Sequence, residues 1–260
     1  MSEHAYHHIE TLLASTRPEE IHQGLELVRK EIARVGSKEA RPLFEMVSAL
    51  FYFDPLDRPD LVPILDEAVS LVVGFGEWII PELLNELDAG DFKAQLAIGH
   101  ALGRLGADAI QPLISEYKSS SDGARHTFIL FALGKIKSPR IVEALPLALE
   151  AAGSPELEFR DTATRALGKF AESMLPGQVP EELRRELVER LHRNLADTSP
   201  GIRAKAVRSL GKMAKFGHLA DAERLKLKDI CQHLAGTDER YEWDHAYIVR
   251  REAEESLKYV

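Results

Sequence analysis

The stretch DFKAQLAIGHALGRL, from Asp91 to Leu105, decides the fold because close versions of it recur further along the chain. Each version is centred on a glycine that follows a leucine, and a small residue precedes the leucine. The four glycines are Gly103, Gly134, Gly168 and Gly211, which lie 31, 34 and 43 residues apart. A period of this size is typical of repeats that each contain two helices.

Apolar residues recur at fixed offsets from these glycines. In the first copy Ile98 lies five residues before the glycine, Leu102 lies one residue before it, and Leu105 lies two residues after it. The other copies also have apolar residues at these three positions. These offsets share one face of a helix, which predicts that the face is buried against neighbouring helices. The small residue two positions before each glycine allows those helices to approach closely.

A second register extends the repeat towards the N-terminus. Gly36 has an equivalent in Gly106, and Pro42 has one in Pro112. Both pairs are separated by 70 residues, which is two periods. No stretch shows the alternation of apolar and polar residues that a strand needs. The sequence predicts about seven antiparallel helix pairs, among them a helix over about Pro139 to Ala151. We expect one continuous domain over residues 1–260, most regular over 91–216.

The segment DTSPGIRAKAVRSLGKM, Asp197 to Met213, carries a resemblance to a known family. This segment resembles the HEAT repeat, in particular the phycobilisome-lyase HEAT-like type. The resemblance lies in the order of its residues, which is an aspartate, an arginine, and then two small residues, leucine, glycine and a basic residue. The resemblance covers Asp91 to Met213 well and the ends less well. It implies an all-α solenoid in which helix pairs stack into a superhelix.

Composition limits the function classes. The net charge of −9 and the isoelectric point near 5.6 disfavour general binding to nucleic acid or to anionic membranes. The single cysteine, Cys231, excludes an internal disulfide framework, and the N-terminal MSEHAYHHIE lacks the features of a secretion signal. No apolar run approaches the roughly 20 residues of a membrane helix. We therefore expect a cytoplasmic protein without a membrane segment.

The most repeated polar feature is a basic residue directly after each glycine. These residues are Arg104, Lys135, Lys169 and Lys212, and Arg165, Lys205, Arg208 and Lys215 add positive charge in the later copies. One interpretation is structural, because cations at a helix C-terminus meet the negative end of the helix dipole. The other is a positive stripe that binds an acidic partner. We take these eight residues as candidate partner-binding residues.

A second polar column lies eight residues before the glycines. It contains His126, Arg160 and Arg203, with Asp122, Glu158 and Asp197 slightly upstream. In HEAT repeats the corresponding arginine and aspartate form a ladder between neighbouring repeats. The resemblance therefore implies a structural ladder here.

Few residues indicate chemistry. His4, His7 and His8 have a helical spacing that can point imidazoles the same way, but no acidic or cysteine ligand accompanies them. No phosphate loop, dinucleotide motif or nucleophile elbow is present. Cys231 is expected to be a packed thiol. The segment YEWDHAY, Tyr241 to Tyr247, is expected either to cover the end of the solenoid or to form a docking surface. We predict no catalytic residue, no metal and no cofactor.

Three functions remain open. The leading one is a non-enzymatic scaffold or adaptor that binds a protein on the concave face of the solenoid. The alternative, implied by the resemblance, is a tetrapyrrole (bilin) lyase or chaperone. The third is nucleic-acid binding or repair through the basic residues of the later copies, a function that the acidic composition disfavours. The oligomeric state and the partner are left open.

Overall fold

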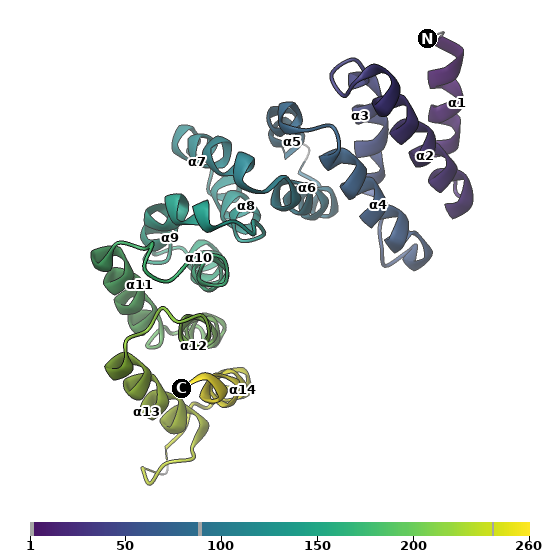
Figure 1. The fold of residues 1–260 in the computed structure, drawn as a ribbon. Coiled ribbons are helices and arrows are strands. Elements are labelled where there is room, and N and C mark those ends of the chain that lie inside the picture. The colour runs from purple at the N-terminus through teal and green to yellow at the C-terminus, as the bar shows by residue number, and fades with distance from the viewer. Residues whose placement is uncertain (1–2, 88–89, 241) are drawn as a thin grey trace. The chain divides into compact units, whose positions relative to one another are not determined.

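The computed structural model describes residues 3–87, 90–240 and 242–260, and these residues contain helices and loops but no strand (Figure 1). The all-α prediction is thereby confirmed. Packing divides the chain into two compact units, Met1–Pro112 (unit 1) and Leu113–Val260 (unit 2), and the division falls within one helix. Each unit is described by itself, and the expected single domain over the whole chain stays a prediction.

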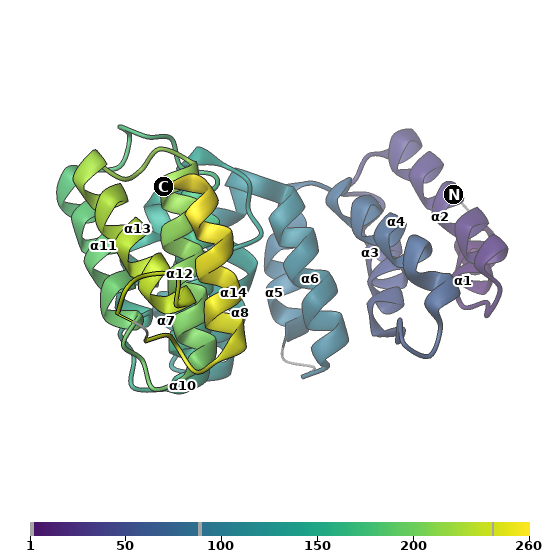
Figure 2. The ribbon, with the colours of Figure 1, turned by 90° about the horizontal axis from the view of Figure 1, so that it is seen from below.

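Unit 1 is built from three helix pairs. Its helices are α1 (Glu3–Leu13), α2 (Pro18–Val35), α3 (Arg41–Ser48), α4 (Val62–Val73), α5 (Ile80–Glu86) and α6 (Phe92–Leu105), with short 3-10 helices η1 (Ala49–Tyr52), η2 (Pro59–Leu61) and η3 (Glu77–Ile79). Helices α2, α4 and α6 pack in sequence, and α1, α3 and α5 each pack against the helix that follows them (Figure 2).

Unit 2 repeats the same arrangement. Its helices are α8 (Gly123–Leu133), α9 (Leu145–Ala151), α10 (Leu157–Ala171), α11 (Glu181–Asn194), α12 (Pro200–Lys215), α13 (Asp221–Ala235) and α14 (Tyr247–Ser256), with η6 (Pro139–Ala144) and η7 (Leu257–Tyr259); η5 (Gly106–Ala109) and α7 (Ile110–Ser119) lie around the division. Helices α8, α10, α12 and α14 lie side by side in one layer, and α9, α11 and α13 form the other (Figure 1). This stacking of consecutive pairs is a solenoid.

The repeated apolar face forms the core, as predicted. The leucines Leu102, Leu133, Leu167 and Leu210 are completely buried, and so are the residues five positions before each glycine. Ile136, Phe170 and Met213, two positions after their glycines, are also buried. Each repeat therefore covers its neighbour's apolar face, and the hydrophobic effect provides the main stabilisation.

Two of the repeated glycines lie directly against a side chain of the neighbouring helix. A Cβ atom on Gly168 would stand 2.3 Å from the Ser209 Oγ, and one on Gly211 would stand equally close to the Ser256 Oγ. The facing serine occupies the small position of the next repeat in both cases. In the last repeat the residue at the glycine's position is Lys258, which lies in η7 directly after α14 and is exposed.

The start of several helices differs from the prediction. The segment predicted as one helix from Pro139 to Ala151 is the 3-10 helix η6 followed by α9. The change occurs just before Pro146, the second residue of α9. Proline has no N–H to donate to the preceding turn, so the α-helical bonding pattern restarts there. Pro42, Pro63 and Pro81 occupy the same place in α3, α4 and α5.

Candidate interaction surface

An arginine near the start of α10 and another near the start of α12 form the ladder between repeats. The Arg160 Nε donates to the Asp197 Oδ2 at 2.6 Å, and the Arg203 Nε donates to the Asp244 Oδ2 at 2.7 Å. Each arginine also donates to main-chain carbonyls of its preceding loop, such as that of Ser154 at 2.7 Å from the Arg160 Nη1. The ladder thus joins each loop to the loop of the next repeat.

The aspartates of the ladder also order the loops that contain them. The Asp197 Oδ1 accepts a hydrogen bond from the Ser199 N–H, and the Asp244 Oδ1 accepts one from the Ala246 N–H, both at 2.8 Å. The hydrogen bond from Arg203 lowers the pKa of Asp244. Burial raises the pKa of Asp197, but the bonds from Arg160 and Ser199 outweigh it, so the net shift is downward. In both ion pairs the carboxylate belongs to the repeat that follows the one containing the arginine.

At His126, the third member of the predicted column, aromatic stacking takes the place of the ion pair. The His126 ring stacks on Tyr117 with centroids 4.1 Å apart, and Phe159 lies 5.9 Å away on α10. The His126 Nε2 lies 2.9 Å from the carbonyls of Tyr117 and Ser120. The Asp122 side chain caps α8, because its Oδ1 accepts the Ala124 N–H.

The basic residues of α12 meet carboxylates from neighbouring elements. Lys205 pairs with Asp161, Arg208 with Glu252 and Lys212 with Glu172. Lys215 instead lies over two aromatic rings, with its Nζ 5.7 Å from the Phe216 centroid and 4.9 Å from that of Tyr259. The local excess of positive charge on this helix is therefore largely neutralised between repeats.

Arg104 belongs to unit 1, where it contacts the preceding repeat. Its guanidinium on α6 pairs with Asp66 on α4 and donates to the Asp66 carbonyl at 3.1 Å and the Ser70 Oγ at 2.5 Å. This contact favours a structural role for Arg104.

Three lysines of unit 2 converge on one carboxylate, Glu172. The distances to its oxygens are 2.8 Å from the Lys137 Nζ, 3.2 Å from the Lys169 Nζ and 2.6 Å from the Lys212 Nζ. Burial alone would raise the pKa of Glu172, but the three ammonium groups lower it to about 2. Glu172 is thus an anion held by cations from three consecutive repeats.

Two more cations stand beside this group. Burial lowers the pKa of Lys135, and the nearby charges of Arg165, Lys169 and Lys137 lower it further. The Lys135 Nζ also lies 4.9 Å from the Phe131 ring centroid, and Arg165 is exposed. We call Lys135, Lys137, Arg165, Lys169, Lys212 and Glu172 the Glu172 cluster. It holds five basic residues and one acidic residue, in a chain whose net charge is −9.

Other residues singled out in the sequence have separate surroundings. Burial raises the pKa of the Cys231 thiol to about 12, so this cysteine is packed and unreactive. Tyr247 and Ile248 are exposed at the start of α14, and Trp243 is exposed in the loop before it. Tyr241 lies outside the described residues. The side chain of His4 also lies outside them, and His7 and His8 are exposed.

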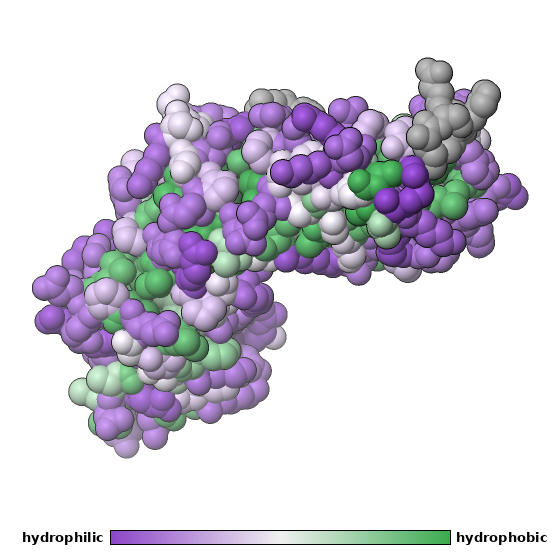
Figure 3. Space-filling model, turned by 45° about the horizontal axis from the view of Figure 1, so that its top comes forward, coloured by the Kyte–Doolittle hydropathy of each residue, from purple (hydrophilic) through white to green (hydrophobic). Residues whose placement is uncertain are grey.

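One face of the molecule is drawn in space-filling form and is mainly polar (Figure 3). On the face drawn in Figure 3, hydrophilic residues cover most of the area and hydrophobic ones appear in small groups between them. In the described part of the chain no helix has the length and apolar character needed to cross a bilayer.

Comparison with known proteins shows the fold. No protein-family model matches the sequence. No curated protein matches it either. Among solved structures, the complex of CpcE and CpcF of phycocyanin lyase from Nostoc sp. PCC7120 is similar with a TM-score of 0.54 and 20% identity, over 68% of this chain and 97% of that one. An engineered protein reaches a TM-score of 0.53 at 19% identity, over 96% of this chain and 66% of that one.

A HEAT-like repeats protein from the archaeon Thermococcus onnurineus NA1 is also similar, with a TM-score of 0.46, 18% identity, and coverage of 99% of this chain and 92% of that one. The first two likenesses, together with the stacked helix pairs, show that the chain has an α-solenoid fold built from repeated helix pairs. At these identities the likeness concerns the fold alone.

Proposed function

We propose that this protein is a non-enzymatic interaction scaffold that binds an acidic segment of a partner protein at the Glu172 cluster. Stacked repeats present side chains from several helices on one continuous surface, which suits the binding of an extended segment. The cluster draws its cations from α10, α12 and the loop after α8. The observation that supports the proposal is the convergence of three lysines on the single carboxylate of Glu172, with Lys135 and Arg165 as further cations beside them.

The excess charge gives the cluster an affinity for further anions. Like charges held close together repel each other, and this repulsion adds to burial, the larger cause, in lowering the pKa of Lys135. A partner's carboxylates would relieve the repulsion in the way that Glu172 does for three of the lysines. Charge complementarity of this kind accelerates association and selects the partner.

Anisotropy of a fluorescent oligoglutamate peptide, titrated with the full chain, tests this proposal. The exposed residues Lys137 and Arg165 are changed together to glutamate, and the control is Arg185→Glu on α11, an exposed arginine of the other layer. We expect the unchanged chain to bind the peptide with an affinity that falls as salt is added. In the double variant, but not in the control, we expect this affinity to be lower by about tenfold or more. Equal affinity in the double variant and the control would refute the docking site.

Two other functions can be separated in the same way. A tetrapyrrole lyase or chaperone, as the phycobilisome-lyase resemblance implies, would change the absorbance spectrum of added bilin or haem, and an unchanged spectrum removes that function. Binding of nucleic acid through the basic residues would appear as anisotropy of a labelled oligonucleotide at low salt. Absence of binding at low salt removes this third function.

A further inference from the structure

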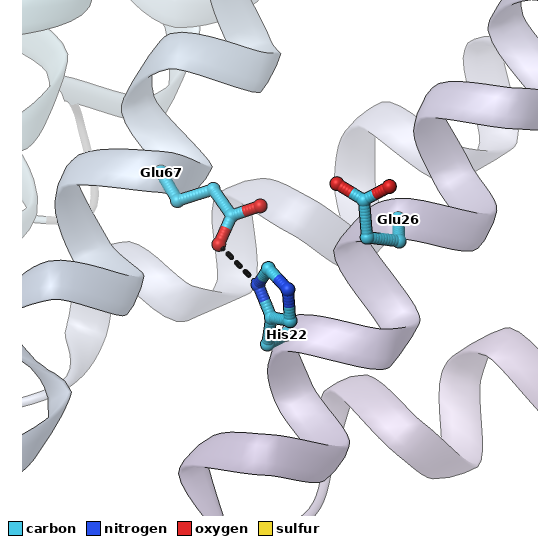
Figure 4. Close-up of side chains that lie close together, drawn as sticks. All are labelled: His22, Glu26 and Glu67. Atoms are coloured by element: carbon cyan, nitrogen blue, oxygen red, sulfur yellow. Dashed lines mark hydrogen bonds and ion pairs between the residues drawn. The ribbon is translucent and has the colours of Figure 1, made fainter.

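A histidine and two glutamates meet between two neighbouring repeats of unit 1. His22 and Glu26 lie one turn apart on α2, and Glu67 lies on α4 (Figure 4). The ligand atoms that the three side chains offer all lie within 4.8 Å of one another. The His22 Nδ1 stands 2.7 Å from the Glu67 Oε2, so the imidazole and the carboxylate already face each other. We propose that these three residues bind a divalent transition metal of the Zn²⁺ class.

The donor set and its spacing suit such an ion. Imidazole nitrogen and carboxylate oxygen are both ordinary zinc ligands, and sites with three protein ligands complete their tetrahedron with water. Bond lengths of about 2.0–2.1 Å at a tetrahedral angle place two ligand atoms roughly 3.3 Å apart. His22 and Glu67 therefore need to separate by about half an ångström. The His22 side chain is 55% exposed and can make this adjustment by rotating.

A cation already joins the two glutamates. The Arg29 guanidinium pairs with Glu26 and, at 3.3 Å, with the Glu67 Oε1. Two carboxylates that converge repel each other unless a positive charge lies between them. Arg29 supplies that charge, and a Zn²⁺ ion would supply two. Since Arg29 is long and about half exposed, it can turn into the solvent when a metal binds. Arg29 is therefore a competitor for the site.

A bound metal would link two consecutive repeats. Helices α2 and α4 are the second helices of neighbouring pairs, and they pack against each other within unit 1. In unit 2 the Arg160–Asp197 and Arg203–Asp244 pairs make the equivalent connection. Metal binding would stabilise unit 1 according to the ion's concentration relative to its dissociation constant. This inference is independent of the acidic-partner proposal, because it concerns other residues and another ligand.

Calorimetric titration of Zn²⁺ into the chelator-treated full chain tests the inference, with thermal unfolding as a second measurement. We expect saturable binding of one ion at this site and a higher unfolding temperature. His22→Gln and, separately, Glu67→Gln should each weaken binding about tenfold or more. Arg29→Gln should tighten it several-fold, because the competing cation is removed. This last variant distinguishes a metal site from a simple ion-pair network.

The control is the double variant His7→Gln and His8→Gln, which removes exposed histidines on α1 and should leave the affinity unchanged. Circular dichroism establishes that each variant is folded. If His22→Gln or Glu67→Gln does not fold, Glu26→Gln provides another change of a ligand, on α2. The inference is overturned if Zn²⁺ does not bind, if His22→Gln binds it as well as the unchanged chain does, or if only the α1 variant loses it.

Discussion

At the scale of single residues, the repeated glycine has different importance in different repeats. Gly168 faces Ser209, whose Oγ donates to the Thr164 carbonyl at 3.0 Å across the helix interface. The serine can make this bond only because the opposing residue has no side chain. Beside Gly134 the nearest atom of the next repeat is the Ala166 Cα, 3.8 Å from where a Cβ would stand. The glycine is therefore required for close approach at Gly168 but not at Gly134.

The substitution Gly168→Ala tests this difference. The added methyl group would stand 2.8 Å from the Ser209 Cβ and 3.0 Å from its Cα, so α10 and α12 must move apart. We expect a loss of about 1–3 kcal/mol in the free energy of unfolding, measured by urea denaturation. The control is Gly134→Ala, which should cost much less.

A double variant separates overpacking from other effects of the alanine. Ser209→Gly removes the side chain that the Gly168 methyl group would meet, so it should partly restore the stability of Gly168→Ala. The sum of the losses in free energy of unfolding measured for the two single variants should then exceed the loss measured for the double variant. Simple additivity would show that the two positions do not press on each other.

The Glu172 carboxylate predicts a specific response to acid. Its pKa is lowered to about 2 in the folded protein, below an ordinary glutamate value of about 4.3 in the unfolded chain. Ionised Glu172 therefore contributes stability above pH ~4.3, and the contribution disappears as the pH falls towards 2. We expect Glu172→Gln to be less stable at neutral pH and to lose less between pH 5 and 2, as followed by thermal unfolding. A parallel pH profile for the two proteins would contradict this account.

The sequence indicated every cation of the Glu172 cluster except Lys137, but it did not indicate their partners. Arg208 and Glu252 are 44 residues apart, as are Lys205 and Asp161, so each pair depends on how the repeats stack. Glu172 has no distinctive context in the sequence, and Lys137 lies outside the aligned column. A periodic basic residue indicates a shared direction of side chains, whereas the charge balance at each place depends on residues from neighbouring repeats.

At the scale of helices and loops, the Arg–Asp ladder sets how consecutive pairs stack. The Asp244 side chain is 8% exposed and that of Arg203 is 20% exposed, so this ion pair is shielded from water. The same aspartate orders the start of α14 through the Ala246 N–H. Removing one member leaves a shielded charge without its counterpart, which costs far more than the loss of an exposed pair.

Substitution of Asp244 by alanine should therefore destabilise the protein strongly. We expect a loss on the order of 2–4 kcal/mol in the free energy of unfolding. The matched control is Asp229→Ala, which removes an aspartate that is 67% exposed and pairs with Arg240. An exposed pair contributes about 0–1 kcal/mol, so this change should have little effect. Denaturant titration of both variants measures the difference, and similar losses would contradict a structural role for the ladder.

The helices themselves were well predicted, since apolar periodicity, prolines and glycines mark them locally. In α2, for example, Pro18 is the first residue of the helix and Gly36 directly follows its last residue. The 3-10 helices before Pro63, Pro81 and Pro146 were missed, because the bonding pattern there depends on a single absent N–H. The stacking of His126 on Tyr117 was also missed, since it depends on side-chain shape rather than on spacing.

At the scale of the whole molecule, the solenoid fold follows from repetition. The same local pattern, copied along the chain, places the same face of each helix pair against the next, so one correct alignment predicts the architecture. The cluster of His22, Glu26 and Glu67 could not be predicted in this way, because His22 and Glu67 lie 45 residues apart and outside the aligned signature. Repetition thus explains the scaffold, while sites arise where individual residues differ from the repeat.

Stacked repeats contact mainly their neighbours, which has a consequence for unfolding. Damage to one interface should then loosen the adjacent helices and spread little further, in contrast to a globule with one cooperative core. In hydrogen exchange followed by mass spectrometry, Asp244→Ala should speed the exchange of α12, α13 and α14 and leave α2 and α4 unchanged. These helices lie in different units. An equal acceleration in both would show that the whole chain unfolds as a single cooperative structure.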